Sequence, residues 1–258
     1  MKEEKSMNKK ILKLLTSQPF VLFVFIVVVS VATNSVNDKF LTASTINSIL
    51  GQAAGLGLVA AGATMLVISG HFDISVGRMV GLAMCTMALL MNNGMNPFVV
   101  SIIGILICVG CSVFNGALSI LFNAPSFIVT LASGSIFYSI ALLITDGYMQ
   151  TLYGKYRFLS SYKVFGVFPL IWLILLLGFV AVFLILKHTQ TGRQIFAIGT
   201  NEKAAYLSGV NINRSKIKFF VLSGILVGIA SMLMLSRISA AQATTGEGME
   251  LEAIGAVV

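Results

Sequence analysis

Long apolar runs separated by short polar stretches dominate the chain. Seven runs come near the length of about 20 residues that a membrane-spanning helix needs. They cover residues 16–33, 46–69, 76–92, 97–119, 126–145, 168–186 and 218–236. Charged residues fall between these runs and do not follow one side of each. The pattern predicts an all-α fold, a polytopic transmembrane helical bundle with about seven spans, in one transmembrane domain over 1–258.

Composition narrows the class of protein. Of the 258 residues, 57% are hydrophobic and 10% are charged, whereas about a quarter of the residues in a soluble domain are charged. The lipid bilayer is therefore the expected surrounding. The net charge of +8 does not indicate nucleic-acid binding, because the basic residues lie in the connections between apolar runs and form no basic face.

The basic residues also predict an orientation. If the N-terminus is cytoplasmic, twelve of the 17 Lys and Arg residues fall in cytoplasmic segments. This bias predicts a multi-pass protein of the cytoplasmic (inner) membrane with its N-terminus inside. Because no clear small-x-small cleavage site follows the first run in Thr33-Asn34-Ser35, we expect that run to be a retained anchor helix and not a cleaved signal peptide. The twelve are Lys2, Lys5, Lys9, Lys10, Lys13, Arg78, Lys187, Arg193, Lys203, Arg214, Lys216 and Lys218.

The segment Gly70–Gly77, between the second and third runs, has the composition of a backbone break. Its terminal glycines permit a sharp turn, Asp73 can cap the next helix, and Ser75 can satisfy freed amide groups. Irregular backbone at membrane depth persists only where protein or a water-filled cavity covers it. We expect either a broken or re-entrant segment beside a transport path or an ordinary cytoplasmic hairpin capped by Asp73.

Uncharged polar residues lie inside several spans. They can bond neighbouring helices together, or some can line a path for a polyhydroxylated solute. No span has a full charge near its middle, which speaks against a proton- or sodium-coupled carrier. With the residues of the predicted break, the candidate path residues are Asn47, Gln52, Asp73, Ser75, Asn115 and Thr130. The pairs Gly51/Gly55, Gly77/Gly81 and Gly224/Gly228 predict close helix packing.

The inner connection, residues 188–217, is the most informative polar stretch. Asn201 suits a helix N-cap, Glu202 an acidic first turn, and Gly209 the position after the helix end. These signals predict a short helix of about two turns. Such a helix could lie on the membrane surface or could seat a separate cytoplasmic motor.

The sequence contains no motif that indicates a catalytic activity of the chain itself. No G-x-x-x-x-G-K-[ST] phosphate loop occurs, and His71 and His188 stand in no metal-ligand spacing. Cys108 and Cys111 form a C-x-x-C inside an apolar run, where packing explains them better than redox chemistry. We therefore expect no enzyme, no metal and no cofactor here. An apolar segment begins only at the last positions, so we expect a transmembrane domain that is incomplete at its C-terminus.

Five segments in order resemble the permease subunits of ribose/xylose/galactose-type ABC importers. Gly70–Gly77 is similar to that family's GG-I-D-L-S-V-G signature, and Asn115-Gly116 to its N-G pair. The run 127–131 is similar to F-I-V-T-L, and residues 192–209 to its cytoplasmic block G-R…A-I-G-x-N-E-x-A-A-x-x-S-G. Residues 246–258 resemble G-x-G-x-E-L-D-A-I-A-A-V-V, while His71, Phe72 and Glu252 depart from the family pattern.

The resemblance implies a function and partners. A monosaccharide would be imported by alternating access. A tandem P-loop ATPase that binds ATP and Mg would drive the import. An extracytoplasmic sugar-binding protein and a second permease copy, identical or different, would complete the assembly. The coupling loop 188–217 would contact the ATPase through Arg193, Asn201, Glu202, Ala204, Ala205, Ser208 and Gly209. The alternatives are permeases for branched-chain amino acids, nucleosides or autoinducer-like furanosides, and a standalone secondary carrier.

Overall fold

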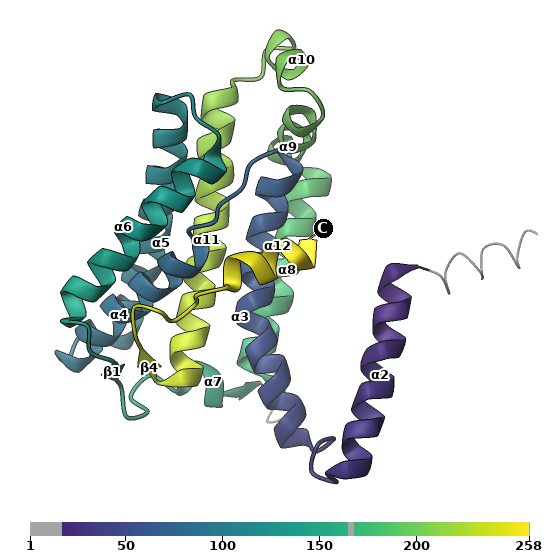
Figure 1. Ribbon diagram of the computed structural model, residues 1–258, viewed down its shortest axis with the longest axis vertical. Helices are drawn as coiled ribbons and strands as arrows, with labels where there is room; N and C mark the ends of the chain where they lie inside the picture. Colours follow the sequence, from purple (N-terminus) through teal and green to yellow (C-terminus); the bar gives the residue numbers. More distant parts are fainter. Residues whose placement is uncertain (1–16, 165–167, 258) are drawn as a thin grey trace, which may run out of the picture. The chain divides into compact units, whose positions relative to one another are not determined.

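The computed structural model describes residues 17–164 and 168–257, and most of these are helical (Figure 1). The chain divides into two units, residues 1–50 and 51–258. The boundary falls inside helix α3 (Ala43–Ile68). Each unit is described separately below.

The first unit contains helix α2 (Gln18–Val36) and the start of α3. Apolar side chains are exposed all round α2, from Val21 to Val31. A helix that is apolar on every side is typical of a membrane span, since no face is reserved for water. Asn34 stabilises the following turn, because its Oδ1 accepts a hydrogen bond of 3.2 Å from the Leu41 amide.

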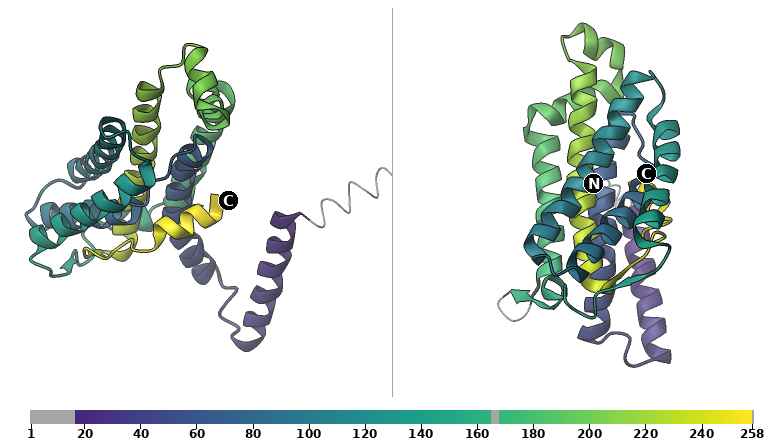
Figure 2. Two further views of the ribbon diagram at one scale, coloured as in Figure 1. Left: turned by 45° about the horizontal axis from the view of Figure 1, so that its top comes forward. Right: turned by 90° about the vertical axis from the view of Figure 1, so that its left-hand side faces the viewer.

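The second unit is a bundle of long helices joined at both ends by short elements (Figure 2). Its long helices after α3 are α4 (Val76–Asn92), α5 (Pro97–Leu121), α6 (Ser126–Thr145), α8 (Leu170–His188) and α11 (Ile212–Ile238). Its short helices are α7 (Phe158–Ser161), α9 (Gln190–Thr200), α10 (Glu202–Leu207) and α12 (Met249–Val257). Its strands are β1 (Gln150–Thr151), β2 (Lys163–Val164), β3 (Phe168–Pro169) and β4 (Ala240–Ala241).

The predicted spans agree with these helices. In the described ranges, five helices are long and apolar enough to cross a membrane: α3, α5, α6, α8 and α11. The apolar stretch Phe20–Val36 and α4 are shorter. The all-α polytopic bundle is thus confirmed, and each predicted run coincides with a helix to within a few residues.

Helices α5 and α11 form the centre of the second unit, where they lie side by side in every view (Figures 1 and 2). A Cβ atom added to Gly228 would stand 2.6 Å from the Cα of Ile105, and one added to Gly224 would stand 2.8 Å from the Ser112 hydroxyl. The absence of side chains at these two positions lets the backbones approach closely, as the glycine pair predicted.

Two segments enter the bundle from opposite ends and stop partway through it (Figure 1). After α3, residues 69–75 form a non-helical segment of turns and irregular backbone, and then α4 begins. After α11 and β4, residues 242–248 form a second non-helical segment, almost all of it turns, and then α12 begins. Helix α4 meets the second segment at Gly81, where an added Cβ atom would lie 2.6 Å from the Ala243 carbonyl oxygen. The broken segment predicted at 70–77 is present, and a second one accompanies it.

The depth of α4 corrects the interpretation of Arg78 as a residue of a cytoplasmic loop. Arg78 belongs to the first turn of α4, and a Cβ on Gly134 would lie 3.6 Å from its Cγ. Gly134 is near the middle of α6. The predicted orientation now rests on the other eleven basic residues, of which Lys2, Lys5, Lys9, Lys10 and Lys13 lie outside the described residues.

The connection between α6 and α8 is fastened to the bundle. Strands β1 and β4 pair antiparallel, with Gln150 opposite Ala241. Among the loop tyrosines, Tyr148, Tyr153 and Tyr162 are exposed, but Tyr156 is fully buried and its hydroxyl bonds to the Ser101 hydroxyl of α5. Burial raises the pKa of Tyr156, while the bond to Ser101 lowers it by a smaller amount.

Candidate functional site: a buried polar network and a coupling face

A buried polar network holds the first re-entrant segment. The Asp73 carboxylate accepts hydrogen bonds from the amide of Ser75 (2.9 Å) and from its hydroxyl (2.6 Å). Asn115 of α5 donates through Nδ2 to the Ser75 hydroxyl at 2.8 Å and reaches the carboxylate oxygens at 3.4 and 3.5 Å. Ser133 of α6 donates to the Asn115 carbonyl oxygen. The network ties the segment to two long helices and gives a buried carboxylate the partners that it requires.

The backbone of the same segment also needs hydrogen-bond partners, since it lies outside a helix. Two hydroxyls of α6 supply them. The amide of Phe72 donates to Ser126 at 3.0 Å, and the amide of Ile74 donates to Thr130 at 3.0 Å. The first two turns of α6 are thereby built around the re-entrant segment.

The predicted capping is only partly correct. Ser75 is the N-cap of α4, but its side chain makes no capping bond to the helix. Its hydroxyl instead donates to Asp73, whose carboxylate satisfies the Ser75 amide. The Asp73 carboxyl oxygen, 2.6 Å away, gives this hydroxyl an acceptor outside the helix, so the hydroxyl is directed toward Asp73.

Of the six candidate path residues, the structure brings four together. Asp73, Ser75, Asn115 and Thr130 share the network and are all buried. Asn47 lies in the first unit, and Gln52 is an exposed residue of α3 in the second. The assignment of the six to a translocation path stays a prediction.

The inner connection contains the predicted short helix, α10. Asn201 is its N-cap, with Oδ1 accepting from the Ala204 amide at 2.9 Å, and Gly209 after its end has a φ of 87°. Sequence reasoning missed α9 just before it. The signal was present, because Thr189 caps α9 through a 3.2 Å bond from the Gly192 amide.

Most of the predicted coupling residues form an exposed surface, here called the coupling face. Arg193, Asn201, Glu202, Ala204, Ser208 and Gly209 are exposed, whereas Ala205 packs inward and is 4% exposed. Sequence reasoning passed over the largest apolar groups on this surface, Tyr206 (67% exposed) and Leu207 (77% exposed). Exposed aromatic and aliphatic groups beside charges are typical of a protein-binding surface.

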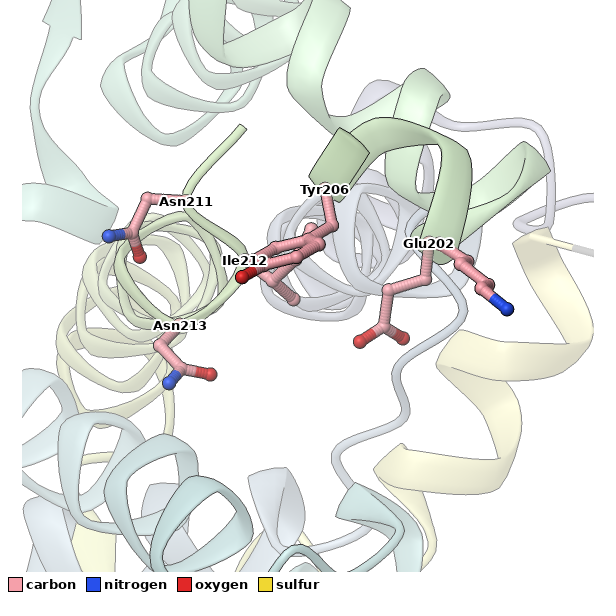
Figure 3. A pocket seen from close by; sticks show the side chains of 6 residues that line it. Glu202, Tyr206, Asn211, Ile212 and Asn213 are labelled. Atoms are coloured by element: carbon pink, nitrogen blue, oxygen red, sulfur yellow. The ribbon is translucent and has the colours of Figure 1, made fainter. Parts of the chain in front are cut away.

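Two cavities adjoin the coupling face. One of about 570 Å³ lies between α10 and the start of α11, and Figure 3 shows Glu202 and Asn213 bordering it from opposite sides. The other, of about 490 Å³, shares these two residues and extends to His71 and Lys216. Lys216 donates to the Ser119 hydroxyl at 2.7 Å. The mixed polar lining suits an inserted polar segment of a partner protein.

Helix α9, which carries Arg193 of the coupling face, is in direct contact with the origin of the re-entrant segment. A Cβ atom on Gly199, in α9, would overlap the carbonyl oxygen of Ile68, the last residue of α3. It would also lie 3.3 Å from the Cα of Ser69. A displacement of α9 would therefore act on the backbone just before Asp73.

Among the described residues, no group of three or more His, Cys, Asp and Glu side chains could hold a metal ion. Cys85 and Cys108 are buried free thiols and Cys111 is a half-buried one. The polar network and the coupling face can bind a solute or another protein and can pass on a movement between α9 and the re-entrant segment. Their side chains suit those roles.

Comparisons with known proteins agree with this arrangement. Residues 45–258 match the family model described as "Branched-chain amino acid transport system / permease component". The ribose import permease protein RbsC of Bacillus subtilis is 36% identical over 245 residues, covering 93% of this chain and 74% of the relative. RbsC of Escherichia coli K12 is 30% identical, covering 92% and 74%.

The autoinducer 2 import system permease protein LsrC of Yersinia enterocolitica is also similar, at 30% identity over 86% of this chain and 62% of the relative. No solved structure matches. The chain is a multi-pass membrane protein, and it belongs to the family of branched-chain amino acid transport system permease components, which includes the permeases of ABC importers.

Proposed function

We propose that this chain is the permease subunit of an ABC importer that brings a ribose-like monosaccharide into the cytoplasm. The named activity of the most similar relatives described above, ribose import, supports this substrate class. The proposal places the protein in the inner membrane with its N-terminus and its coupling face on the cytoplasmic side, following the distribution of basic residues.

The observation that carries the proposal is the coupling face itself. Its capped helix α10 presents Glu202, Tyr206 and Leu207 outward beside a cavity of about 570 Å³. A helix of six residues has little stability by itself, so the Asn201 cap and the packing of Ala205 hold it in place. A partner can therefore apply force to it without unfolding it.

The contact between Gly199 and Ile68 suggests how the force is used. A partner ATPase seated on the coupling face would move α9 when it binds ATP and Mg. Because Gly199 packs directly on the end of α3, that motion would shift the backbone leading to Asp73. The network of Asp73, Ser75 and Asn115 would transmit it to α5 as a two-state repacking. ATP hydrolysis would belong to the partner.

The proposed assembly has further members. A tandem P-loop ATPase would bind inside, a sugar-binding protein would deliver substrate outside, and a second permease copy would complete the path. The exposed tyrosines of the outer connection, Tyr148, Tyr153 and Tyr162, offer a surface for the binding protein.

One second candidate has specific support. The likeness to LsrC favours an autoinducer-like furanoside as cargo, at lower identity than the ribose permease of B. subtilis. Both cargoes are small, neutral and polyhydroxylated. The named activities of these relatives give no comparable support to amino-acid or nucleoside cargo.

The test is reconstitution of the permease in proteoliposomes with its ATPase and binding protein. We expect ATP-dependent ribose uptake, and we expect Arg193→Ala and Glu202→Ala to retain membrane insertion but to hydrolyse ATP without matching uptake. Arg157→Ala, in the outer connection, is the matched control and should transport normally. Unchanged uptake in both coupling-face variants would reject the coupling role, and wild-type uptake without nucleotide would reject the ABC mechanism.

A further inference from the structure

A charged pair lies partway through the bundle, where the two re-entrant segments meet. The guanidinium of Arg78, through Nη2, donates to Oε1 of Glu247 at 2.7 Å. Arg78 is in the first turn of α4, and Glu247 is in the segment that leads to α12. The pair joins residues that are 169 positions apart in the sequence.

The depth of this pair follows from its neighbours on two long helices. Gly134, near the middle of α6, is next to Arg78, where an added Cβ would lie 3.6 Å from Cγ. Cys108, near the middle of α5, has its sulfur 3.9 Å from the carbonyl oxygen of Met79, the residue after Arg78. The ion pair is therefore far from either end of the spans.

The pair is not sealed inside the protein. The Arg78 side chain is 27% exposed and the Glu247 side chain 54% exposed. Charged groups at such depth face a water-filled cavity or another polar surface, because contact with lipid tails costs several kcal/mol for each. The face formed by α4, α6 and the start of α12 is thus turned away from lipid.

Tyr138 of α6 fixes the orientation of the pair. The Arg78 carbon Cζ lies 4.7 Å from the centre of the Tyr138 ring, within the range of a cation–π contact. A guanidinium has five N–H donors in a fixed plane, and Glu247 takes only part of them. The second carboxylate oxygen keeps acceptor capacity, so unused donors and acceptors lie next to each other.

This combination suits the hydroxyl groups of a sugar. A vicinal diol both donates and accepts, so one hydroxyl can accept from the guanidinium while its neighbour donates to the carboxylate. The pair has no net charge, which favours a neutral ligand over an anion or a cation. Two exposed hydroxyls of α6, Ser135 and Ser139, lie within one turn of Tyr138 and add polar surface.

We propose that Arg78 and Glu247 form a monosaccharide-binding subsite in the translocation path, with Tyr138 as its positioning residue. The proposal rests on the function proposed above and names contacts for its substrate class. A second permease copy seated on the same charged pair is the competing explanation, and the test below separates the two.

The test measures direct sugar binding by saturation-transfer difference NMR, with the full chain in lipid nanodiscs and ribose as the probe. The wild type should transfer saturation to ribose. Glu247→Gln should weaken the apparent affinity about tenfold, the scale on which one charge-assisted hydrogen bond weakens binding. Glu252→Gln, an exposed acid on α12 outside the pair, is the matched control and should bind as the wild type does.

Two further variants distinguish a ligand from a structural clasp. Arg78→Lys keeps the charge and the ion pair but loses the planar fork, so we expect weakened ribose binding with an unchanged melting temperature. The exchange Arg78→Glu with Glu247→Arg restores the pair in reverse. If the pair only joined the segments or a second copy, Arg78→Lys and Glu247→Gln would leave ribose binding unaltered while the exchange restored the melting temperature, and that result would overturn the proposal.

The same proteins, assayed for ATP-driven uptake, separate this inference from the proposed function. Normal uptake by the wild type together with unaltered ribose binding in Glu247→Gln and Arg78→Lys would overturn the subsite alone. Wild-type uptake together with no detectable saturation transfer to ribose would also overturn it. Failure of uptake by the wild type would instead count against the importer.

Discussion

Asn115 is the side chain that connects the re-entrant segment to α5, and Asn115→Ala should loosen that segment. Its amide donates to Ser75 at 2.8 Å, makes long contacts with Asp73 at 3.4 and 3.5 Å, and accepts from Ser133. Ser133 has a second acceptor, the Thr130 carbonyl oxygen at 3.2 Å. The loss is therefore about two net hydrogen bonds plus poorer solvation of a buried carboxylate, about 2–4 kcal/mol.

A native thiol reports this loosening. Cys108 is fully buried beneath the start of α4, with its sulfur 3.9 Å from the Met79 carbonyl oxygen. With Cys85 and Cys111 replaced by alanine, a membrane-permeant maleimide labels Cys108 only when the segment opens. A reduction of 2–4 kcal/mol in the opening free energy raises the labelling rate about 30-fold to 900-fold, if opening is fast relative to labelling.

The matched control is Asn92→Ala, which removes an exposed asparagine at the other end of α4. It should leave the labelling rate of Cys108 within about twofold of the parent, as expected for a surface substitution. If Asn115→Ala gave no faster labelling than Asn92→Ala, the network would not be what holds the re-entrant segment, and the reasoning would be refuted.

Three other predictions concern the coupling face and the outer connection. Gly199→Val forces a side chain against the end of α3, at a cost of about 1–3 kcal/mol, and should lower uptake per ATP hydrolysed, whereas Gly94→Asn, at a left-handed position after α4 with no close neighbour, should not. Asn201→Ala removes the α10 cap, worth about 1 kcal/mol, and should weaken ATPase co-purification, which Asn201→Asp should restore. At a pH below 10, Tyr156→Phe should lower the melting temperature, because it removes the hydrogen bond to Ser101, worth about 1 kcal/mol. Because burial raises the Tyr156 pKa, this contribution is complete below the ordinary value of 10.0 and disappears as the pH rises through the raised value, so a difference that persists at higher pH would contradict it.

Much of the fold could be predicted because the bilayer imposes it. Apolar runs had to be helices of nearly the observed length, and the glycines and Asp73 marked the first break. The α10 helix was predictable for a local reason, since its cap at Asn201 and its end at Gly209 lie within nine residues.

The rest depends on contacts between distant positions. Residues 242–248 contain no apolar run, and only their packing on Gly77 and Gly81 shows that they re-enter the bundle. For the same reason Arg78 was assigned to a loop, although it meets Glu247 deep in the bundle. None of the predicted apolar runs has a charge near its middle. Charges nevertheless lie deep in the bundle, because α4 and α12 begin partway through it.

The proposed mechanism requires the coupling face to lie on the cytoplasmic side of the membrane, where the partner ATPase binds it. The most direct test places a single cysteine at Ser208, in a chain without Cys85, Cys108 and Cys111, and applies a membrane-impermeant maleimide to membrane vesicles of both orientations. The account predicts labelling in inside-out vesicles alone, with the opposite result for a cysteine at exposed Tyr153. Labelling of the Ser208 position in right-side-out vesicles would place the coupling face outside the cell and contradict the account.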